Sequence, residues 1–481
     1  MKKTLIITAA ALVLAACSAP TPKPYGPVPT DAQLAWQRME INMFCHFGPN
    51  TFTGAEWGTG QEAEEVFAPT ALDCHQWVDV AGQAGMGGII LTAKHHDGFC
   101  LWPSQYSTHT VPDTLDVLRR FVDACRGRVK AGVYISPWDR NHPTYGTEEY
   151  NTVFANTLRE VHTQYGPFFE QWFDGACGEG SNGKKQVYDW PLFEGTVLGI
   201  NPQCVIFSDV GPSCRWVGNE EGRADETNWS TLQVENGKRK VESEAAAQGT
   251  PPLSTFNFPL STLSWIPAEV DVSIRPGWFW HANEHPKTVD ELMEIYYNSV
   301  GRNGLLLLNV PPDPRGRISA EDSAVLVAFR AERDRIFSND LAQGANIEAY
   351  CEYGDRLIEK NDPRHPTSNL TDTAYHTFWT IRGKDTSHIT LIITLPEVQE
   401  IDMVMLQEYI PLGQRVTKFY ISYADPKANG GMIIAEGTTI GYKRIVRFPF
   451  PIQTKTLYID ILHALAPPVI NRIALYNSKA K

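Results

Sequence analysis

Strand-like and helix-like segments alternate along the chain from residue 31 to about residue 338. Residues Asp73–Met86 carry Trp77, Val80 and Ala84 on one face of a helix, and the apolar run Gly88–Thr92 that follows is typical of a buried strand. Repeated units of this kind imply parallel strands with helices packed outside them. About eight units over roughly 300 residues predict a (β/α)8-type barrel.

The predicted barrel strands are Met39–Phe47, Gly88–Thr92, Ala131–Ser136, Phe168–Phe173, Cys204–Ser208, two strands within Leu263–His281, and Leu305–Asn309. The predicted helices are Asp73–Met86, Asp116–Cys125, Glu148–Gln164, Val289–Val300 and Ala320–Ile336. An open doubly wound sheet is the alternative. It lacks support, because no glycine-rich phosphate turn follows the first strand.

Beyond about residue 340 the pattern changes to short β-rich runs joined by turns. These runs are His376–Arg382, His388–Leu395, Ile401–Gln407, Val416–Tyr423, Tyr442–Phe448, Thr456–Leu462 and Ile470–Tyr476. They show no helical period, so residues 340–481 are predicted to form an antiparallel β-sandwich that follows a barrel domain at 31–338. Such a domain either packs on the barrel as a structural partner, which we favour, or itself binds carbohydrate.

The chain begins with Lys2 and Lys3, followed by a short apolar run and the sequence Leu14-Ala15-Ala16-Cys17. This pattern predicts an export signal at residues 1–17. Leu-Ala-Ala-Cys resembles the bacterial lipobox, which implies cleavage before Cys17 and acylation of its thiol; an ordinary secretory signal is the alternative. The proline-rich residues 18–30 predict an extended tether.

No other segment is long and apolar enough to cross a bilayer. We therefore expect an exported protein, in the periplasm or at the cell surface, held on a bacterial envelope membrane only by its lipid anchor. The formal net charge is −13. An acidic chain does not neutralise phosphates, so nucleic acid is not an expected partner. The nine cysteines are scattered, with no C-x-x-C pair, and most are expected to be free and buried.

One carboxylate, Asp174, stands at the end of the aromatic strand Phe168–Phe173 and directly before Gly175. A carboxylate in that place is costly to bury unless it is paired or used in chemistry. Its position is that of a nucleophile at the mouth of a parallel barrel. The alternative is an aspartate that simply begins a turn.

The other predicted strand ends also carry histidine, tryptophan, tyrosine, arginine or carboxylate side chains. They are found in His46, Glu56-Trp57, Lys94-His95-His96-Asp97, Tyr134, Trp138-Asp139, Trp172, Arg215–Glu220 and Glu269–Trp278. Polyhydroxylated ligands need this mixture of aromatic faces, imidazoles and carboxylates. Two carboxylates on such a rim indicate glycoside cleavage.

Other chemistries have weaker support. His95 and His96 are adjacent, and neighbouring residues of a strand point to opposite faces, which suits one metal ion poorly. A metal site and a structural role for one of the two histidines are the alternatives. No Gly-x-Ser-x-Gly elbow and no Walker-type loop occur. We expect a site that needs no metal and no cofactor.

Several motifs, in order, resemble glycoside hydrolase family 29, the α-L-fucosidases. They are His46-Phe47-Gly48, Glu56-Trp57, Lys94-His95-His96-Asp97-Gly98-Phe99 and Trp172-Phe173-Asp174-Gly175. The resemblance covers roughly residues 31–338. Arg215–Glu220 and Trp265–Asp271 resemble the subfamily that prefers α-1,3/1,4-linked fucose, and the C-terminal part is similar to the β-domain that accompanies such barrels.

The resemblance implies that Asp174 is the nucleophile and Glu220 the general acid/base. Glu221, Asp225 and Glu269 are competitors for the second role. The resemblance also implies the residues that surround the sugar: His46, Glu56, His95 and His96 on its hydroxyls, Trp57, Tyr134 and Trp172 shaping the pocket, Arg215 near the sugar and Trp278 stacked on it.

The expected protein is thus a retaining exo-α-L-fucosidase that releases terminal fucose, α-1,3/1,4-linked, from fucosylated oligosaccharides or glycoconjugates. A non-catalytic surface glycan-binding protein is one alternative, and binding of fucosides without turnover would indicate it. A barrel glycosidase for another sugar, such as an α-galactosidase, is the other. Release from a nitrophenyl galactoside rather than from the fucoside would indicate that activity.

Overall fold

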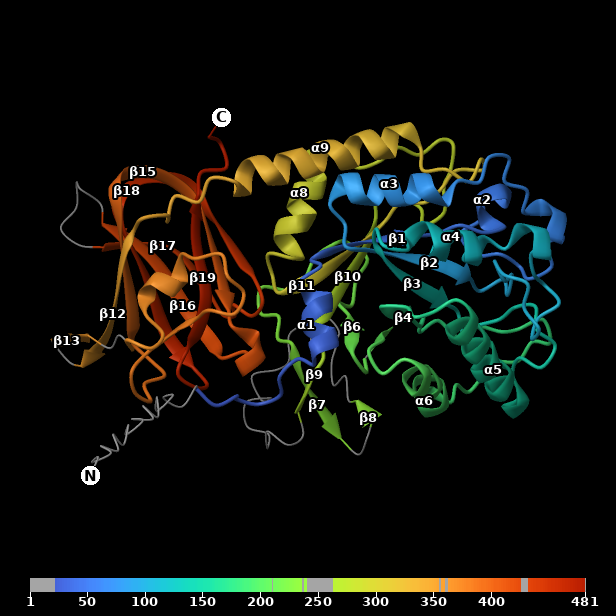
Figure 1. Ribbon diagram of the computed structural model, residues 1–481, viewed down its shortest axis with the longest axis horizontal. Coiled ribbons are helices and arrows are strands. Elements are labelled where there is room, and N and C mark those ends of the chain that lie inside the picture. Colours follow the sequence, from blue (N-terminus) through green and yellow to red (C-terminus); the bar gives the residue numbers. More distant parts are fainter. Residues whose placement is uncertain are drawn as a thin grey trace, which may run out of the picture.

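Eight parallel strands close into a barrel in the order β1-β11-β10-β6-β5-β4-β3-β2 (Figure 1). The computed structural model describes residues 22–209, 211–235, 238–239, 263–353, 356–359, 362–424 and 431–480. The barrel strands are β1 (Ile41–Cys45), β2 (Gly88–Lys94), β3 (Lys130–Ile135), β4 (Glu170–Trp172), β5 (Val205–Ser208), β6 (Cys214–Trp216), β10 (Ala268–Ser273) and β11 (Gly304–Asn309). The predicted barrel is confirmed. The predicted signal segment, with Cys17, lies outside the described residues.

Helices surround the barrel, and α9 runs from it toward the C-terminal sheet (Figure 1). The described helices are α1 (Asp31–Gln37), α2 (Asn50–Thr53), α3 (Cys74–Ala84), α4 (Val117–Cys125), α5 (Glu148–Gln164), α6 (Trp190–Ile200), α8 (Val289–Asn298) and α9 (Ala320–Phe337). Side chains cap their first turns: Asp73, Asp116 and Ser319 each accept a hydrogen bond from the backbone N–H three residues on. None of the described helices combines the length and the apolar composition that crossing a membrane requires.

The sixth barrel strand is β6, which lies well before the segment predicted to contain it. Leu263–His281 holds one barrel strand, β10. Its other strand, β9 (Leu263–Trp265), pairs antiparallel with β7 (Thr231–Glu235) in a small sheet that also contains β8 (Lys238–Arg239). The prediction of two barrel strands in that segment is therefore wrong. A three-residue strand with an arginine at its centre has neither the length nor the apolar run by which a strand is recognised.

Alternate residues of the barrel strands fill the interior of the barrel. Phe44, Ile90, Tyr134, Trp172, Phe207, Cys214, Leu305 and Leu307 belong to one buried apolar cluster. The alternation follows from the two-residue period of a strand. It also determines which side chains reach the rim where the strands end, the usual place of chemistry in such barrels.

The C-terminal part is an eight-stranded sheet in which each described strand pair is antiparallel, as predicted. Its strands are β12 (Asn346–Tyr353), β13 (Arg356–Glu359), β14 (Trp379–Thr380), β15 (Ile389–Glu408), β16 (Val416–Ala424), β17 (Gly431–Gly437), β18 (Arg444–Ala464) and β19 (Val469–Tyr476). Pairs of predicted runs merge into β15 and β18, which have 20 and 21 residues. A separate apolar cluster forms the core of this sheet.

Glu40 joins the barrel to the C-terminal sheet. Its carboxylate accepts hydrogen bonds from Lys443 Nζ at 2.5 Å and from the hydroxyls of Tyr442 and Tyr296 at 3.0 and 3.1 Å. Burial alone would raise the pKa of Glu40, but Lys443 and the two hydroxyls hold it below its ordinary value. The carboxylate therefore stays charged at this contact between the two parts of the chain.

Candidate active site

Asp174 lies two residues beyond Trp172 and so continues the alternation of β4 at the rim of the barrel. Its Oδ1 accepts a hydrogen bond from the N–H of Ala176 at 2.8 Å, and its Oδ2 accepts one from the hydroxyl of Tyr134 at 3.0 Å. Nε2 of His96 lies 3.6 Å from the same Oδ2. The side chain of Asp174 is 25% exposed to solvent, so its carboxylate can be reached from outside.

Asp209 lies beside Asp174. A Cβ atom at position 175 would overlap the Asp209 carboxylate, so a larger residue there would have to displace that side chain. Burial raises the pKa of Asp174, while the hydrogen bonds from Ala176 and Tyr134 oppose that rise. Burial also raises the pKa of Asp209, and the charge of Asp174 adds to the effect.

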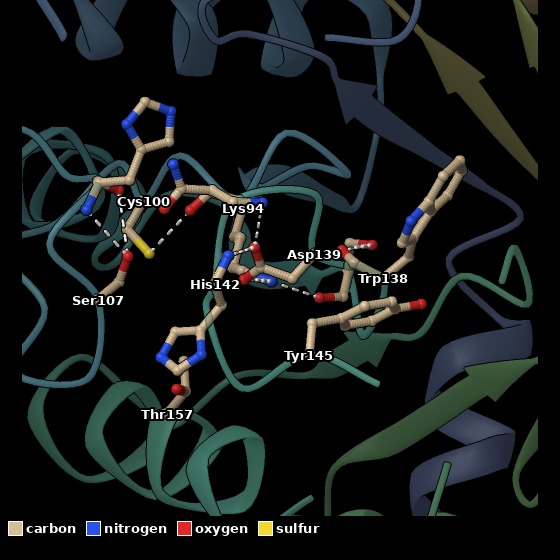
Figure 2. Close-up of polar contacts among 12 residues, drawn as sticks. Lys94, Cys100, Ser107, Trp138, Asp139, His142, Tyr145 and Thr157 are labelled. Carbon is tan, nitrogen blue, oxygen red and sulfur yellow. Dashed lines mark hydrogen bonds and ion pairs between the residues drawn. The ribbon is translucent and has the colours of Figure 1, made fainter. Parts of the chain in front are cut away.

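The ends of β2 and β3 are held together by a buried ion pair. Nζ of Lys94 lies 3.0 Å from Oδ2 of Asp139, and both side chains are 3% exposed (Figure 2). The same Nζ donates to the carbonyl of Ser136 at 2.9 Å, and Ser136 Oγ lies 2.8 Å from Nδ1 of His96. These contacts fix the strand end from which His95 and His96 extend.

The three predicted histidines are buried close together and are neutral. Burial lowers the pKa of His46 and of His96 to about 3, and holds that of His95 well below its ordinary value. Nδ1 of His46 lies 2.8 Å from Oδ1 of Asn309; because that amide oxygen only accepts, Nδ1 carries the proton. Nδ1 of His95 is buried without a hydrogen-bond partner. Neutral imidazoles with open nitrogens can donate to or accept from sugar hydroxyls.

In the part of the chain that the structure describes, no three ligand-type atoms that include one of these histidines lie within 4.8 Å of one another. Among the described residues, the group of three close metal-type ligands consists of Glu170, Cys214 and Glu269, and includes no histidine. The centroids of the adjacent His95 and His96 rings are 4.1 Å apart, so the two rings line the same side of the site.

Trp278 links three predicted residues. Its ring centroid is 5.1 Å from that of His46, its backbone N–H donates to Oε2 of Glu56 at 2.8 Å, and its Nε1 donates to Oε2 of Glu220 at 3.2 Å. Glu56 is also held by Nε2 of His281 at 2.6 Å. Trp57 lies further out: it is 59% exposed and packs edge-on against His96.

The four candidate acids have different surroundings. Glu220 is exposed in the loop after β6 and contacts Trp278. Glu221 pairs with Arg223 at 2.6 Å and is 64% exposed. Glu269 is fully buried under the rim and bonds to Trp172. The charge of Asp225 acts on Arg215 and Arg302. Glu220 is thus the exposed acid with a described contact to a pocket tryptophan, whereas the contact of Glu269 to Trp172 is fully buried.

Arg215 is separated from the other predicted residues. It is 1% exposed, and its guanidinium donates to Oδ1 of Asn228 at 3.0 Å and to the carbonyl of Trp229 at 3.2 Å. Its neighbours Cys214 and Trp216 point into the barrel, so the strand alternation directs Arg215 outward. The predicted contact between Arg215 and a sugar finds no support in this geometry.

Asn309 and His281 were missed as candidates, and Asp271 was named only within the rim segment Glu269–Trp278, without a role of its own. Asn309 orients His46, and His281 orients Glu56. Asp271 accepts a hydrogen bond from Nε1 of Trp216 at 2.9 Å, and burial, followed by the charge of Glu220, raises its pKa well above its ordinary value. Asn309 and Asp271 lie on strands and could have been found from their two-residue spacing to Leu307 and Glu269. His281 lies in a loop, where no spacing rule applies.

Similarity to known proteins identifies the family of this chain. The protein-family model described as Alpha-L-fucosidase matches residues 25–330. This chain belongs to the α-L-fucosidase family. It is 37% identical over 468 residues to Alpha-L-fucosidase 1 of Arabidopsis thaliana, covering 96% of this chain and 89% of that protein.

Two solved structures of family members are similar over nearly the whole chain. SpGH29 has a TM-score of 0.84 at 34% identity, covering 95% of this chain and 100% of that one. A GH29 fucosidase of Ruminococcus gnavus, solved in complex with fucose, has a TM-score of 0.85 at 29% identity, covering 96% and 97%. The similarity to both extends beyond the barrel to the C-terminal sheet of this fucosidase.

Proposed function

We propose that this α-L-fucosidase is a retaining exo-enzyme in which Asp174 is the nucleophile and Glu220 the general acid/base. The observation that carries the proposal is the position of Asp174: a reachable carboxylate at the end of β4, with each oxygen held by one hydrogen-bond donor. Two donors on a carboxylate stabilise its charged form, which is the form that attacks.

In the proposed reaction, Asp174 attacks the anomeric carbon of fucose and the bond to the leaving oxygen breaks. Glu220 donates its proton to that oxygen. Glu220, now ionised, then takes a proton from water, which attacks the same carbon and releases Asp174 with a second inversion. Trp278 donates a hydrogen bond to Glu220 and its ring contacts that of His46. These contacts support Glu220 as the acid/base, because they place it beside the histidines of the proposed sugar site.

We propose that neutral His46, His95 and His96, together with Glu56, hold the fucose hydroxyls. Trp57, Tyr134, Trp172 and Trp278 would provide aromatic surface to the C–H faces of the sugar. The preference for α-1,3/1,4-linked fucose is supported by the sequence resemblance at Arg215–Glu220 and Trp265–Asp271.

One product experiment tests the mechanism. Wild-type enzyme is given 4-nitrophenyl α-L-fucoside, and the anomeric configuration of the first-formed fucose is followed by proton NMR. We expect the α-anomer; a β-anomer as first product would overturn the retaining mechanism. A parallel panel of α-1,2-, α-1,3- and α-1,4-fucosylated oligosaccharides tests the linkage preference. Preferred release of fucose from the α-1,2 substrate would contradict the proposed preference for α-1,3/1,4-linked fucose.

We further propose that the chain is exported and anchored through a lipid on Cys17, on the basis of its first 17 residues alone. Metabolic labelling with tritiated palmitate should mark the wild-type protein and leave Cys17→Ser unlabelled. Equal labelling of both proteins would contradict the anchor.

A further inference from the structure

Two carboxyl groups meet inside the barrel, below the proposed site. Glu170 on β4 and Glu269 on β10 both have 0% exposure. One oxygen of each and Sγ of Cys214 on β6 all lie within 4.8 Å of one another. This close approach of two acids in a sealed interior requires an explanation, because burying a charged carboxylate is costly unless it is paired.

Tryptophan side chains satisfy one oxygen of each carboxyl. Nε1 of Trp36 donates to Oε2 of Glu170 at 2.7 Å, and Nε1 of Trp172 donates to Oε1 of Glu269 at 2.9 Å. The thiol of Cys214 approaches Oε1 of Glu170 at 3.8 Å. Oε2 of Glu269 is buried and accepts no hydrogen bond from any residue that the structure describes. Two ionised carboxylates cannot satisfy each other, whereas one proton between them gives this oxygen its missing partner.

No described cation contributes to the electrostatics of the pair. The described titratable groups on which the charges of the two carboxyls act are the thiols of Cys204 and Cys214 and the carboxyl of Asp271. Each of these is neutral or negative. Burial raises the pKa of both Glu170 and Glu269, and the mutual repulsion raises that of Glu269 further.

We propose that Glu170 and Glu269 share one proton as a carboxylic acid–carboxylate pair, and that Glu269 is a positioning residue for the active site through Trp172. The indole of Trp172 is stacked on Phe207 at 4.0 Å and on Tyr134 at 5.3 Å, and Tyr134 donates to Asp174. The hydrogen bond that this indole donates to Glu269 fixes its rotation. Only the activity readout of the proposal rests on the proposed function.

Two substitutions separate the proton from the hydrogen bond. In Glu269→Gln the amide N–H₂ donates to Glu170 in place of the shared proton, and the amide oxygen still accepts from Trp172. Glu269→Met keeps the volume and removes both functions. We expect kcat/KM of Glu269→Gln on 4-nitrophenyl α-L-fucoside to stay within about threefold of wild type. Glu269→Met should lose about tenfold or more, which corresponds to one hydrogen bond.

Two readouts do not depend on activity. The infrared spectrum of wild type at neutral pH should contain the carbonyl band of a protonated, buried carboxylic acid, and Glu269→Gln should lack it. Above about pH 4.3, where an unfolded glutamate is ionised, native wild type holds one more proton than its unfolded state. Its unfolding equilibrium constant, relative to that of Glu269→Gln, should therefore rise about tenfold per pH unit until the shared proton is lost.

Several results would overturn the proposal. A divalent metal ion present at one equivalent in the purified wild-type protein would replace the shared proton as the explanation. An infrared band that persists in Glu269→Gln would show that Glu170 and Glu269 do not share a proton. A ratio of unfolding constants that is independent of pH would show the same. If the Glu269→Met variant kept the kcat/KM of the wild type, Glu269 would not be a positioning residue for the active site. If the wild type released no fucose, the proposed function would fail while the infrared and unfolding measurements still decided on the proton.

Discussion

The hydroxyl of Tyr134 donates a 3.0 Å hydrogen bond to Oδ2 of Asp174, and this bond comes from the neighbouring barrel strand β3. A donor on a carboxylate favours its ionised form, which lowers its pKa. The relationship therefore connects a buried aromatic residue to the charge state of the proposed nucleophile.

Tyr134→Phe removes this hydroxyl and leaves the ring. Without the donor, the pKa of Asp174 rises, so the acidic limb of the kcat/KM pH profile should move upward by about one pH unit. The maximum rate should fall about tenfold. The exposed Tyr106→Phe serves as the matched control and should keep the wild-type profile. An unchanged acidic limb in Tyr134→Phe would show that the bond does not tune Asp174.

Asp174→Ala should abolish release from 4-nitrophenyl α-L-fucoside while the circular dichroism spectrum stays that of the folded protein. Added azide fits the space of the lost carboxylate and attacks the anomeric carbon, so it should restore part of the turnover. Asp123→Ala, at a surface position on α4, is the control. A folded Asp174→Ala enzyme with near-normal activity would remove Asp174 from the mechanism.

Glu220→Ala should give a slow enzyme whose defect depends on the leaving group. Natural glycosides need protonation of the departing oxygen and should lose about 100-fold or more, whereas 4-nitrophenol departs without an acid and should lose much less. Glu221→Ala is the matched control, since Glu221 is adjacent in sequence but pairs with Arg223. Equal losses on both substrates would assign the acid role to another residue.

His281→Ala and Glu56→Ala should reduce kcat/KM through the same interaction. Glu56 accepts hydrogen bonds from His281 and from the backbone of Trp278. Loss of the His281 or the Glu56 side chain removes the hydrogen bond between them. We expect about tenfold or more for Glu56→Ala, a smaller loss for His281→Ala, and a double variant no worse than Glu56→Ala. His285→Ala, at an exposed histidine bonded to Glu321, is the control. Additive losses in the double variant would indicate two independent roles.

Asp139→Asn should destabilise the protein by about 3–5 kcal/mol, because it leaves Lys94 buried without a counter-charge. Burial alone would raise the pKa of Asp139, but Lys94 and the N–H groups of His142 and Asn141 hold it below its ordinary value. This stabilisation is therefore present above about pH 4 and is lost as the pH falls further. Urea unfolding measures both effects.

The surface variant Asp334→Asn provides the contrast to Asp139→Asn. Asp334 pairs with Arg330 at 2.7 Å but is 62% exposed, so its loss should cost less than about 1 kcal/mol. Similar losses in both variants would show that burial does not strengthen the pair between Lys94 and Asp139.

Long elements with a clear period could be predicted from the sequence. Helix α5 has the predicted bounds, Glu148–Gln164, because its apolar positions repeat without interruption. Helix α6 was missed, since Trp190–Ile200 is largely apolar and contains two glycines, which gives no amphipathic signal. Strand β6 was missed because its three residues have an arginine at the centre and form no apolar run, whereas the equally short β4 lies within the aromatic segment Phe168–Phe173.

The same physical limits apply to the site. The position of Asp174 could be predicted because β4 was recognised. The alternation of side chains along that strand, extended by two residues beyond Trp172, places Asp174 at the strand end. Arg215 was placed near the sugar by the family resemblance, and because β6 was not recognised, the alternation that directs its side chain outward could not be weighed against that placement. The contact between His281 and Glu56 joins residues 225 positions apart, and no local pattern encodes such a contact.

The closure of the barrel has a consequence for how the chain matures. The seam joins the first strand to the last, with Ile41 aligned to Leu306. A nascent chain leaving the ribosome cannot complete this seam until Leu306 has emerged, so every shorter intermediate presents an unpaired edge of β1. Truncation before β11 should therefore yield aggregation-prone fragments.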